Sequence, residues 1–338
     1  MALVAALAAM VLLAWWGLRS RGFNWKVFWS TFRALDRSWL AAAIVFALAT
    51  YIGRALRWAV LMRPVKPNPS ILALTSATAI GFAAITVLGR PGEFVRPYLI
   101  AVKERVPVSS QFAALLLERI FDLLMALLIF GFALSRVHHS EVHAGPALSW
   151  VLAVGGWMAA GLGLTCLVVL LLIRTYGEAM RIRLLEALRF LSERRYARAE
   201  RLVNAFVQGV ESTRSLKSLV MLTVYTVVEW ILIAGSILAL VRAYGNALPF
   251  GLVDVLIFMG FLAFGAVVQV PGIGGGVQVV SVLVLTELFR VPLEVATSAA
   301  MLLWAITFVA IVPIGLVLAF HEGLNWSKLK QLEQEVGE

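Results

Sequence analysis

The sequence predicts an all-α polytopic membrane protein with about six spanning helices and two re-entrant helical hairpins arranged as an inverted repeat. Hydrophobic residues make up 61% of the 338 residues and charged residues 14%, and the mean hydropathy is +0.91, whereas a soluble domain lies near or below zero. The apolar residues form nearly uncharged runs of about 20 residues, the length that an α-helix needs to cross the hydrocarbon core. Runs such as 151–173 lack the polar–apolar alternation of a barrel strand, so the spanning elements are expected to be helices.

Six apolar runs, each bounded by charges, glycine or proline, are predicted to span the membrane. They are 2–18, 38–62, 112–134, 147–173, 217–243 and 295–320. The first run has the length of a signal peptide, but no basic residue precedes it and no clear small-residue cleavage site comes before Arg19. We therefore expect it to be retained as a helix.

The segment 174–216 carries many arginines interleaved with glutamates. Because basic loops remain on the cytoplasmic side, this segment is predicted to be a cytoplasmic helical lobe. Leucines recur within it at helical spacing, which indicates a position on the membrane surface or in a hairpin. A solvated, salt-bridged lobe is favoured over a specific binding site for a partner. This orientation places the tail 321–338 in the cytoplasm of a bacterial cell and the protein in its inner membrane.

The stretch 19–37 conflicts with this orientation. It holds five basic residues, yet the count of spans places it outside the cell. Either 25–35 is an amphipathic helix at the membrane interface, or the run 2–18 is placed wrongly.

Two further apolar runs do not fit as simple spans. The run 70–89 has basic residues on both flanks, which is awkward for a segment whose flanks lie on opposite sides of the membrane. The run 251–290 is broken midway by QVPGIGGGVQ, whose proline and glycines would leave backbone groups unpaired in a lipid-facing helix. Each run is therefore predicted to be a re-entrant hairpin.

The two hairpin regions also resemble each other. GFAAITVLGRPGEFVRP at 81–97 parallels GFLAFGAVVQVPGIGGG at 260–276, and a Val-Pro pair follows each of them. The predicted orientation brings the first hairpin in from the cytoplasm and the second from outside, as in transporters built from inverted repeats. The alternative is a chance resemblance between apolar segments. We thus predict one membrane domain with a first repeat (38–173), the lobe (174–216), a second repeat (217–320) and the tail (321–338).

Ionisable residues at membrane depth are functional candidates, because burying them in lipid is costly. The densest set lies in the first repeat and comprises Arg90, Glu93, Arg96, Glu118, Arg119 and Asp122. Glu118 and Asp122 share a helix face, and these acids are expected to neutralise Arg90 or Arg96 across the hairpin. Such a cluster suits the phosphate of an anionic lipid headgroup, which arginine binds bidentately. It equally suits a buried ion-pair network that locks the hairpin to its helix, and the two roles are compatible.

Two other polar groups lie within predicted spans. Arg54, Arg57 and Trp58 lie near one end of 38–62, and we interpret them as anchors at the membrane interface. Glu229 lies in the middle of 217–243 with no basic neighbour in sequence, so it needs a partner from another helix or is protonated. A hydrogen-bonded packing role for Glu229 is favoured over a role in proton coupling.

The break in the second hairpin contains Pro271, Gly272, Gly274 and Gly275, with Gln278 shortly after them. Its backbone amides are predicted to be free to bind an anion, in the manner of a glycine-rich nest. The alternative is that the glycines only permit tight packing. The break is not a nucleotide-binding loop, because no Lys-Ser or Lys-Thr follows it.

No catalytic constellation appears in the sequence, so we predict no enzyme activity, no cofactor and no metal site. His138, His139 and His143 are interpreted as exposed loop residues, since no spacing of zinc ligands accompanies them. Cys166 lies inside an apolar run and is interpreted as a small packing residue. The net charge of +10 is assigned to positive inside loops rather than to nucleic-acid binding.

The motifs GRPGEFVRPYL, ERIFDLL and PGIGGG make most of the chain resemble the membrane domain of lysylphosphatidylglycerol synthase and its stand-alone relatives. In the bifunctional members this domain flips an aminoacylated phospholipid made by a C-terminal soluble transferase. Some stand-alone members are associated with hopanoid or glycolipid pathways. The resemblance therefore implies a stand-alone, flippase-like, lipid-handling module without the aminoacyl-transferase domain.

The resemblance also implies roles for particular residues. The family positions that match this chain look like Gly92, Glu93, Arg96, Glu118, Arg119 and Asp122. One departure is Gln278, where the family often has a glutamate after the second break.

The leading hypothesis is translocation of an anionic phospholipid, glycolipid, polyprenyl-phosphate or hopanoid across the inner membrane. The alternative is a membrane-embedded lipid-modifying enzyme or an accessory subunit of a lipid-synthesis complex. Membrane lipid is the expected substrate, a lipid-biosynthesis protein or a second copy of the chain is the expected partner, and no nucleic acid is expected. Ion-coupled transport of a small solute is disfavoured, because the spans hold few polar residues.

Overall fold

The computed structural model describes residues 23–137, 192–210, 215–265, 269–270 and 274–323, together with scattered positions between 157 and 190. The predicted helix 2–18, the three loop histidines, Pro271 and Gly272 lie outside the described residues, and so do most of 147–173 and of the tail.

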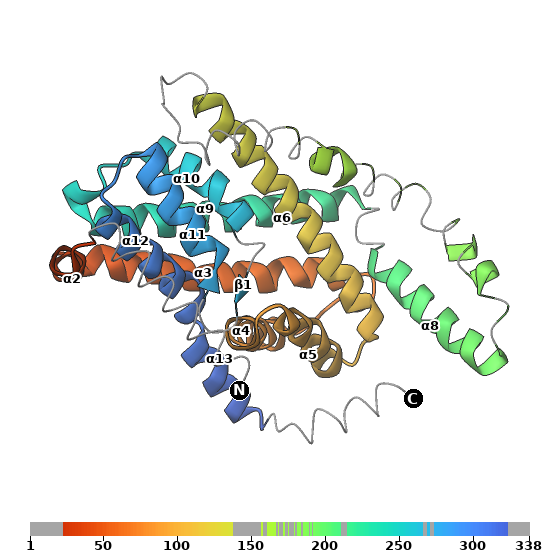
Figure 1. The fold of residues 1–338 in the computed structure, drawn as a ribbon. Coiled ribbons are helices and arrows are strands. Elements are labelled where there is room, and N and C mark those ends of the chain that lie inside the picture. Colours follow the sequence, from red (N-terminus) through yellow and green to blue (C-terminus); the bar gives the residue numbers. More distant parts are fainter. Residues whose placement is uncertain are drawn as a thin grey trace.

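The described residues are almost entirely helical (Figure 1). The helices are α2 (Trp25–Arg33), α3 (Arg37–Met62), α4 (Ile71–Leu88), η1 (Arg90–Phe94), α5 (Val95–Glu104), α6 (Val108–Val137), α8 (Glu193–Val210), α9 (Leu216–Ala243), η3 (Gly245–Ala247), α10 (Leu252–Gly265), α11 (Gly276–Leu283), η4 (Val284–Leu288), α12 (Leu293–Trp304), η5 (Ala305–Val309) and α13 (Val312–His321). The strands are β1 (Gln269–Val270) and β2 (Gly274–Gly275).

Four described helical segments are long and apolar enough to cross a membrane: Arg37–Met62, Ile71–Leu88, Leu216–Ala243 and Leu293–His321. Three of them match the predicted spans 38–62, 217–243 and 295–320. The predicted span 112–134 lies within α6, which is 30 residues long. The chain is therefore an all-helical, multi-pass membrane protein, as predicted, apart from a two-residue β-ladder described below.

The run 70–89 is not itself a hairpin, because α4 is one continuous 18-residue helix. The bend comes directly after it, where Gly89 adopts a positive φ of 73° that favours glycine. After η1, α5 returns along α4, and the amide of Ser70 donates a hydrogen bond of 3.2 Å to Glu104 Oε1. The two ends of the α4–α5 hairpin thus lie together, and the predicted reversal of the chain is present but is centred on 89–94.

The predicted break in 251–290 separates α10 from α11, and these two helices pack against each other. At the break Gln269 pairs with Gly275 and Val270 with Gly274 in an antiparallel ladder. This ladder departs from the all-α prediction. It arises because backbone groups in an apolar setting must be paired, and the helix cannot continue through this glycine-rich segment.

The two halves of the chain contact each other through α3 and α9, which pack along their length (Figure 1). The amide of Asp36, just before α3, donates to the carbonyl of Ala243 at the end of α9, at 3.0 Å. The two helices are therefore antiparallel. Two further contacts between the halves are reciprocal, since α4 packs on α13 and α10 packs on α6.

Each reciprocal contact includes a glycine where the two helices approach closely. A Cβ at Gly315 of α13 would lie 2.5 Å from the Cβ of Ala83 on α4. A Cβ at Gly260 of α10 would lie 3.0 Å from the Cβ of Ala133 on α6. Small residues at these crossings let the helix backbones come together, which is the usual basis of helix packing in membranes.

Each of the two Val-Pro pairs directly follows an arginine in a left-handed backbone conformation. Arg105 and Arg290, directly before them, are the only non-glycine residues with positive φ in the described parts of the chain, and both have a φ of 53°. The amide of Val106 then bonds to the carbonyl of Ala101 at 3.0 Å, and that of Val291 to the carbonyl of Leu285 at 2.9 Å. Both α5 and the α11–η4 segment therefore end in a left-handed cap.

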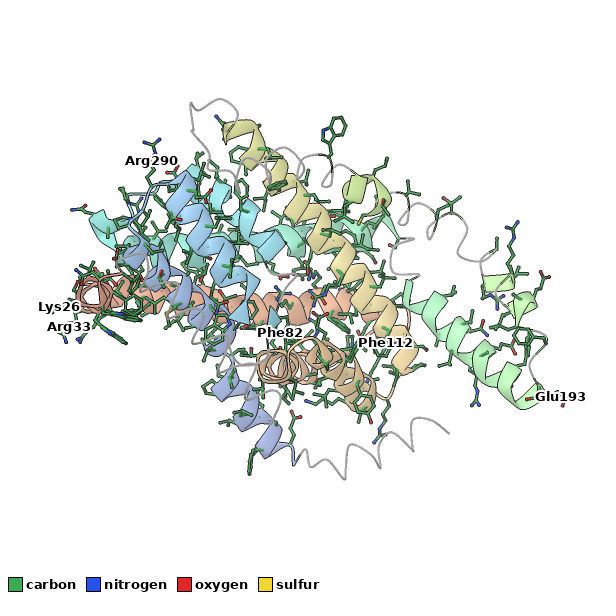
Figure 2. The ribbon with its side chains drawn as sticks, viewed as in Figure 1. Lys26, Arg33, Phe82, Phe112, Glu193 and Arg290 are labelled. Carbon is green, nitrogen blue, oxygen red and sulfur yellow. The ribbon has the colours of Figure 1, made fainter. Side chains whose placement is uncertain are left out.

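A nine-residue helix, α2, occupies most of the stretch 25–35. Phe28 faces the protein, while Trp25 and Trp29 are exposed, and Lys26 and Arg33 point away from the bundle (Figure 2). The helix packs on α12, where the amide of Asn24 donates to Glu294 Oε1 at 2.9 Å. The segment is thus an amphipathic helix, as the first reading of 19–37 expects, and its position at the membrane interface stays a prediction.

Candidate functional site

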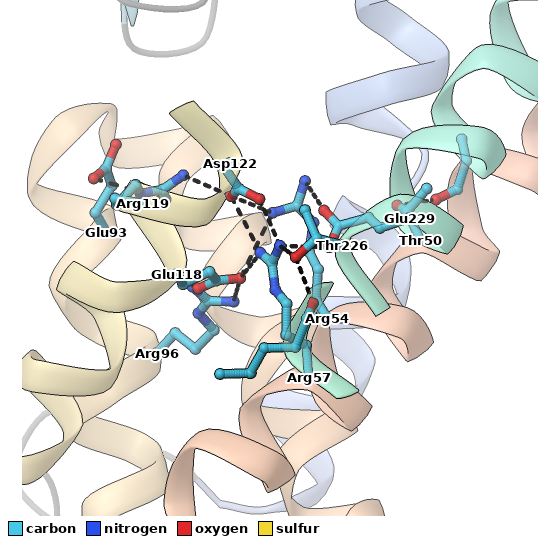
Figure 3. Close-up of polar contacts among 12 residues, drawn as sticks. Thr50, Arg54, Arg57, Glu93, Arg96, Glu118, Arg119, Asp122, Thr226 and Glu229 are labelled. Carbon is cyan, nitrogen blue, oxygen red and sulfur yellow. Dashed lines mark hydrogen bonds and ion pairs between the residues drawn. The ribbon is translucent and has the colours of Figure 1, made fainter. Parts of the chain in front are cut away.

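Charged side chains from α3, α5, α6 and α9 meet inside the bundle (Figure 3). We call this group the charge cluster; it comprises Arg54, Arg57, Glu93, Arg96, Glu118, Arg119, Asp122 and Glu229. It brings together residues from both halves of the chain, because α9 belongs to the second half.

Arg57 is at the centre of the charge cluster and is 1% exposed. Its guanidinium donates to Glu118 Oε1 at 2.6 Å and to Asp122 Oδ1 at 2.5 Å. It also reaches the hydroxyl of Thr226 at 3.2 Å and Glu229 Oε2 at 3.3 Å. A buried guanidinium requires this number of partners, because desolvation of an unpaired charge costs several kcal/mol.

Glu229 has its partners on another helix, which is the first of the two alternatives derived from the sequence. Its Oε1 lies 2.7 Å from Nη2 of Arg54, and its side chain is fully buried. Arg54 is one turn before Arg57 on α3, so these two arginines face the same carboxylate on α9. The ion pair of Arg54 with Glu229 therefore joins the first half of the chain to the second.

Arg96 comes from the α4–α5 hairpin and pairs with both carboxylate oxygens of Glu118, one of them at 3.2 Å. Its guanidinium stacks over Trp58, 4.2 Å from the ring centroid, and lies near Phe82 as well. Gly81 leaves space for it, because a Cβ there would lie 2.5 Å from the Cβ of Arg96. The predicted pairing of the hairpin with α6 is thus present through Arg96.

Arg119 and Glu93 lie at the edge of the charge cluster, on the side away from Glu229 (Figure 3). The side chain of Arg119 is 41% exposed, and its nearest carboxylate oxygens are those of Glu93 at 3.9 Å and Asp122 at 4.0 Å. Arg90 belongs to η1, but its side chain lies outside the described part of the structure.

The interpretation of Arg54, Arg57 and Trp58 as interfacial anchors is wrong. Trp58 is completely buried, and its indole N–H donates to Gln111 Oε1 at 2.8 Å. Arg54 and Arg57 are one turn apart and face the acids of α6, which are also one turn apart. A count of charges by helix face would have matched these two arginines with Glu118 and Asp122. Nothing in the sequence predicts that Thr226 is a hydrogen-bond partner of Arg57.

At the break in the second hairpin, the amide of Gly275 is not free to bind an anion. The amide of Gly275, whose φ is 131°, donates to the side-chain oxygen of Gln278 at 2.5 Å. Gln278 therefore caps the start of α11, and this corrects the prediction of a free nest at Gly275. Gly274 takes part in the β-ladder.

The charge cluster contains as many arginines as carboxylates, four of each, when all are ionised. Its chemistry is that of a neutral ion-pair network in an apolar bundle. Within the described residues no group of histidine, cysteine and acidic side chains could hold a metal ion.

The chain was compared with known proteins and families. The family model described as the lysylphosphatidylglycerol synthase TM region matches residues 3–315. A comparison with curated proteins finds no match. The family is one of multi-pass membrane proteins concerned with lipid handling. Since the match covers nearly the whole sequence, the chain belongs to the lysylphosphatidylglycerol synthase TM-region family.

Proposed function

We propose that this protein translocates an anionic lipid across the bacterial inner membrane, with its C-terminus in the cytoplasm. The observation that carries the proposal is the charge cluster, which joins a helical hairpin to both halves of an otherwise apolar bundle. Ionisable groups are retained at such depth at a high energetic cost, and they commonly mark substrate pathways. Family membership supports lipid as the class of substrate.

An inverted repeat is part of this proposal. It is supported by the antiparallel packing of α3 and α9. One hairpin follows the C-terminal end of α3 and the other the C-terminal end of α9, so the two hairpins start from opposite ends of this helix pair. It is supported also by the reciprocal contacts of α4 with α13 and α10 with α6, and by the shared left-handed caps at Arg105 and Arg290. In transporters of this architecture the two halves rock against each other around a site between them.

The proposed movement requires contacts between the halves that open and close. One candidate is a polar contact at the open end of the first hairpin, where Lys103 Nζ lies 2.6 Å from Glu322 Oε2. Ser76 of α4 also donates to Glu322 and accepts from Lys103. Glu322 directly follows α13, so this contact ties the first hairpin to the second half. Its side chains are partly exposed, so that water can replace the pair.

Reconstitution into vesicles tests the proposal. Fluorescently labelled phosphatidylglycerol, polyprenyl phosphate and a neutral glycolipid are placed in the vesicles, and the labelled fraction of the outer leaflet is followed with a membrane-impermeant quencher. We expect faster exchange of at least one anionic lipid than in protein-free vesicles, with its chemical structure unchanged. Equal exchange rates for every lipid would refute translocation, and a chemically altered lipid would indicate a lipid-modifying enzyme instead.

A further inference from the structure

The four arginines of the charge cluster differ in how completely their charges are paired. Arg57 and Arg96 are 1% and 2% exposed, and each donates at least two hydrogen bonds to carboxylate oxygens. Arg54 lies 2.7 Å from a carboxylate oxygen of Glu229 and stacks over the ring of Phe82 at 4.8 Å. The short ion pairs of these three arginines hold the helices together. An anion could bind to one of them only by displacing its carboxylate partner.

Arg119 is different. Its nearest carboxylate oxygens are 3.9 Å and 4.0 Å away, beyond hydrogen-bonding distance, and its side chain is 41% exposed. Its Nε is buried without a hydrogen-bond partner among the residues that the structure describes, as are the Nε atoms of Arg54 and Arg57. The difference therefore lies in the terminal nitrogens of Arg119, whose carboxylate contacts within that part of the chain are only these two long ones. The guanidinium is therefore held close to the cluster by charge while its donors remain available.

Building on the proposed function, we propose that Arg119 is the residue of the charge cluster that binds the phosphate ester of the lipid headgroup, and that Arg54, Arg57 and Arg96 position it without contacting substrate. A phosphate presents oxygens that match the planar donors of a guanidinium bidentately. Because the cluster is neutral overall, it has no surplus charge to attract an anion, so binding depends on an arginine whose donors are available.

The position of Arg119 on α6 fits this role. Glu118, the preceding residue, is 1% exposed and forms ion pairs with Arg57 and Arg96. These buried ion pairs fix the position of this turn of α6, and therefore the backbone of Arg119. Phe94 of η1, next to Glu93, is exposed. A headgroup at Arg119 would thus meet a charged edge beside apolar surface, which suits an amphiphile better than a free anion.

Equilibrium binding to the purified full-length chain in detergent tests the assignment. The probes are short-chain phosphatidic acid, short-chain phosphatidylglycerol, diacylglycerol without phosphate, and inorganic phosphate. We expect Arg119→Gln to weaken binding of both phospholipids by about ten- to hundredfold, the range for a lost hydrogen-bonded charge contact. Diacylglycerol binding should not change, and Arg119→Lys should lose less affinity than Arg119→Gln because it keeps the charge.

Arg242→Gln is the matched control, since Arg242 is an exposed arginine at the end of α9 and its loss should leave every affinity unchanged. Unchanged phospholipid affinity in Arg119→Gln would overturn the assignment, as would an equal loss of diacylglycerol binding. Should Arg119→Gln fail to fold, Arg119→Lys decides: we expect weaker binding of both phospholipids with unchanged diacylglycerol binding, because the lysine cannot replace the bidentate guanidinium. Wild-type phospholipid affinity in Arg119→Lys would then overturn the assignment. Inorganic phosphate that binds as tightly as the phospholipids would show that the ligand is a free anion rather than a lipid.

The outcomes separate this inference from the proposed function. Wild-type protein that moves lipid in vesicles, with Arg119→Gln binding and moving it at the same rate, refutes only the role of Arg119. Wild-type protein that moves no lipid, yet binds phospholipid through Arg119, refutes only translocation.

Discussion

Arg57 and Glu118 are 61 residues apart in the sequence, yet their side chains form a hydrogen bond of 2.6 Å in the interior of the bundle. Each side chain is 1% exposed. The pair joins α3 to α6, and Glu118 extends the connection to the first hairpin through Arg96. Whatever the protein moves or binds, the relative positions of these three elements depend on this pair.

Removing either partner alone should be strongly destabilising. Arg57→Leu leaves buried carboxylates without their counter-ion, and Glu118→Leu leaves buried guanidinium groups without theirs, so each should lower the free energy of unfolding by about 3–5 kcal/mol. The double variant removes one charge of each sign and should lose clearly less than the sum of the two. Thermal unfolding in detergent, with Arg242→Gln as control, measures this; additive losses would contradict the pairing.

The crossing of α13 and α4 should not tolerate a side chain at Gly315. The Cβ of Gly315→Ala would meet Ala83 Cβ at 2.5 Å and the Ala79 carbonyl oxygen at 2.6 Å, so the helices must shift, at a cost of about 1–3 kcal/mol. Gly53 of α3 has nothing within 4 Å of the corresponding position, and Gly53→Ala should be neutral or stabilising by about 1 kcal/mol. Equal unfolding temperatures for the two variants would argue against the close crossing.

Cysteine labelling should reveal on which side each hairpin opens. In a Cys166→Ser background, single cysteines at Asn68 and Arg105, at the two ends of the first hairpin, should react with an impermeant maleimide from the same side of the membrane. Cysteines at Asn246 and Arg290, at the ends of the second hairpin, should react from the opposite side. All four positions are exposed. Labelling of Asn68 and Arg105 from different sides would mean that the first hairpin is not re-entrant.

The hydrogen bond from the Gly275 amide to the side chain of residue 278 should contribute to the stability of the fold. Gln278→Ala leaves this amide without its partner and should cost about 1–3 kcal/mol. Gln278→Glu keeps an acceptor oxygen at the start of α11, where a negative charge is favourable, and should retain stability. A Gln278→Ala protein as stable as the wild type would show that the cap contributes nothing.

The sequence predicted the class of fold, because hydropathy and the spacing of charges depend on local composition. It also indicated a chain reversal in each of the two regions, from the basic flanks of 70–89 and from the glycine-rich break in 251–290. It misplaced the first bend by treating 70–89 as the hairpin itself. Nothing local distinguishes an apolar helix such as α4, which has a returning partner, from a simple span.

The charge cluster could be predicted only in part. Glu118, Asp122 and Arg96 were found because they occur in dense polar motifs. Arg57 was misread because burial depends on the helices that surround it, and the end of α3 looks like an interface until α6 and α9 are placed around it. The partners of Glu229 could not be predicted for the same reason, because they lie on α3, a distant helix in the sequence.

Movement between the two halves is the central claim, and a cross-link between them tests it most directly. Ser76 of α4 and Glu322 after α13 are in contact, so cysteines at these two positions can be joined by a short reducible cross-linker in the Cys166→Ser protein. We predict that the cross-linked protein exchanges labelled anionic lipid no faster than protein-free vesicles, and that reduction restores the wild-type rate. Lipid exchange at the wild-type rate with the cross-link in place would contradict the account.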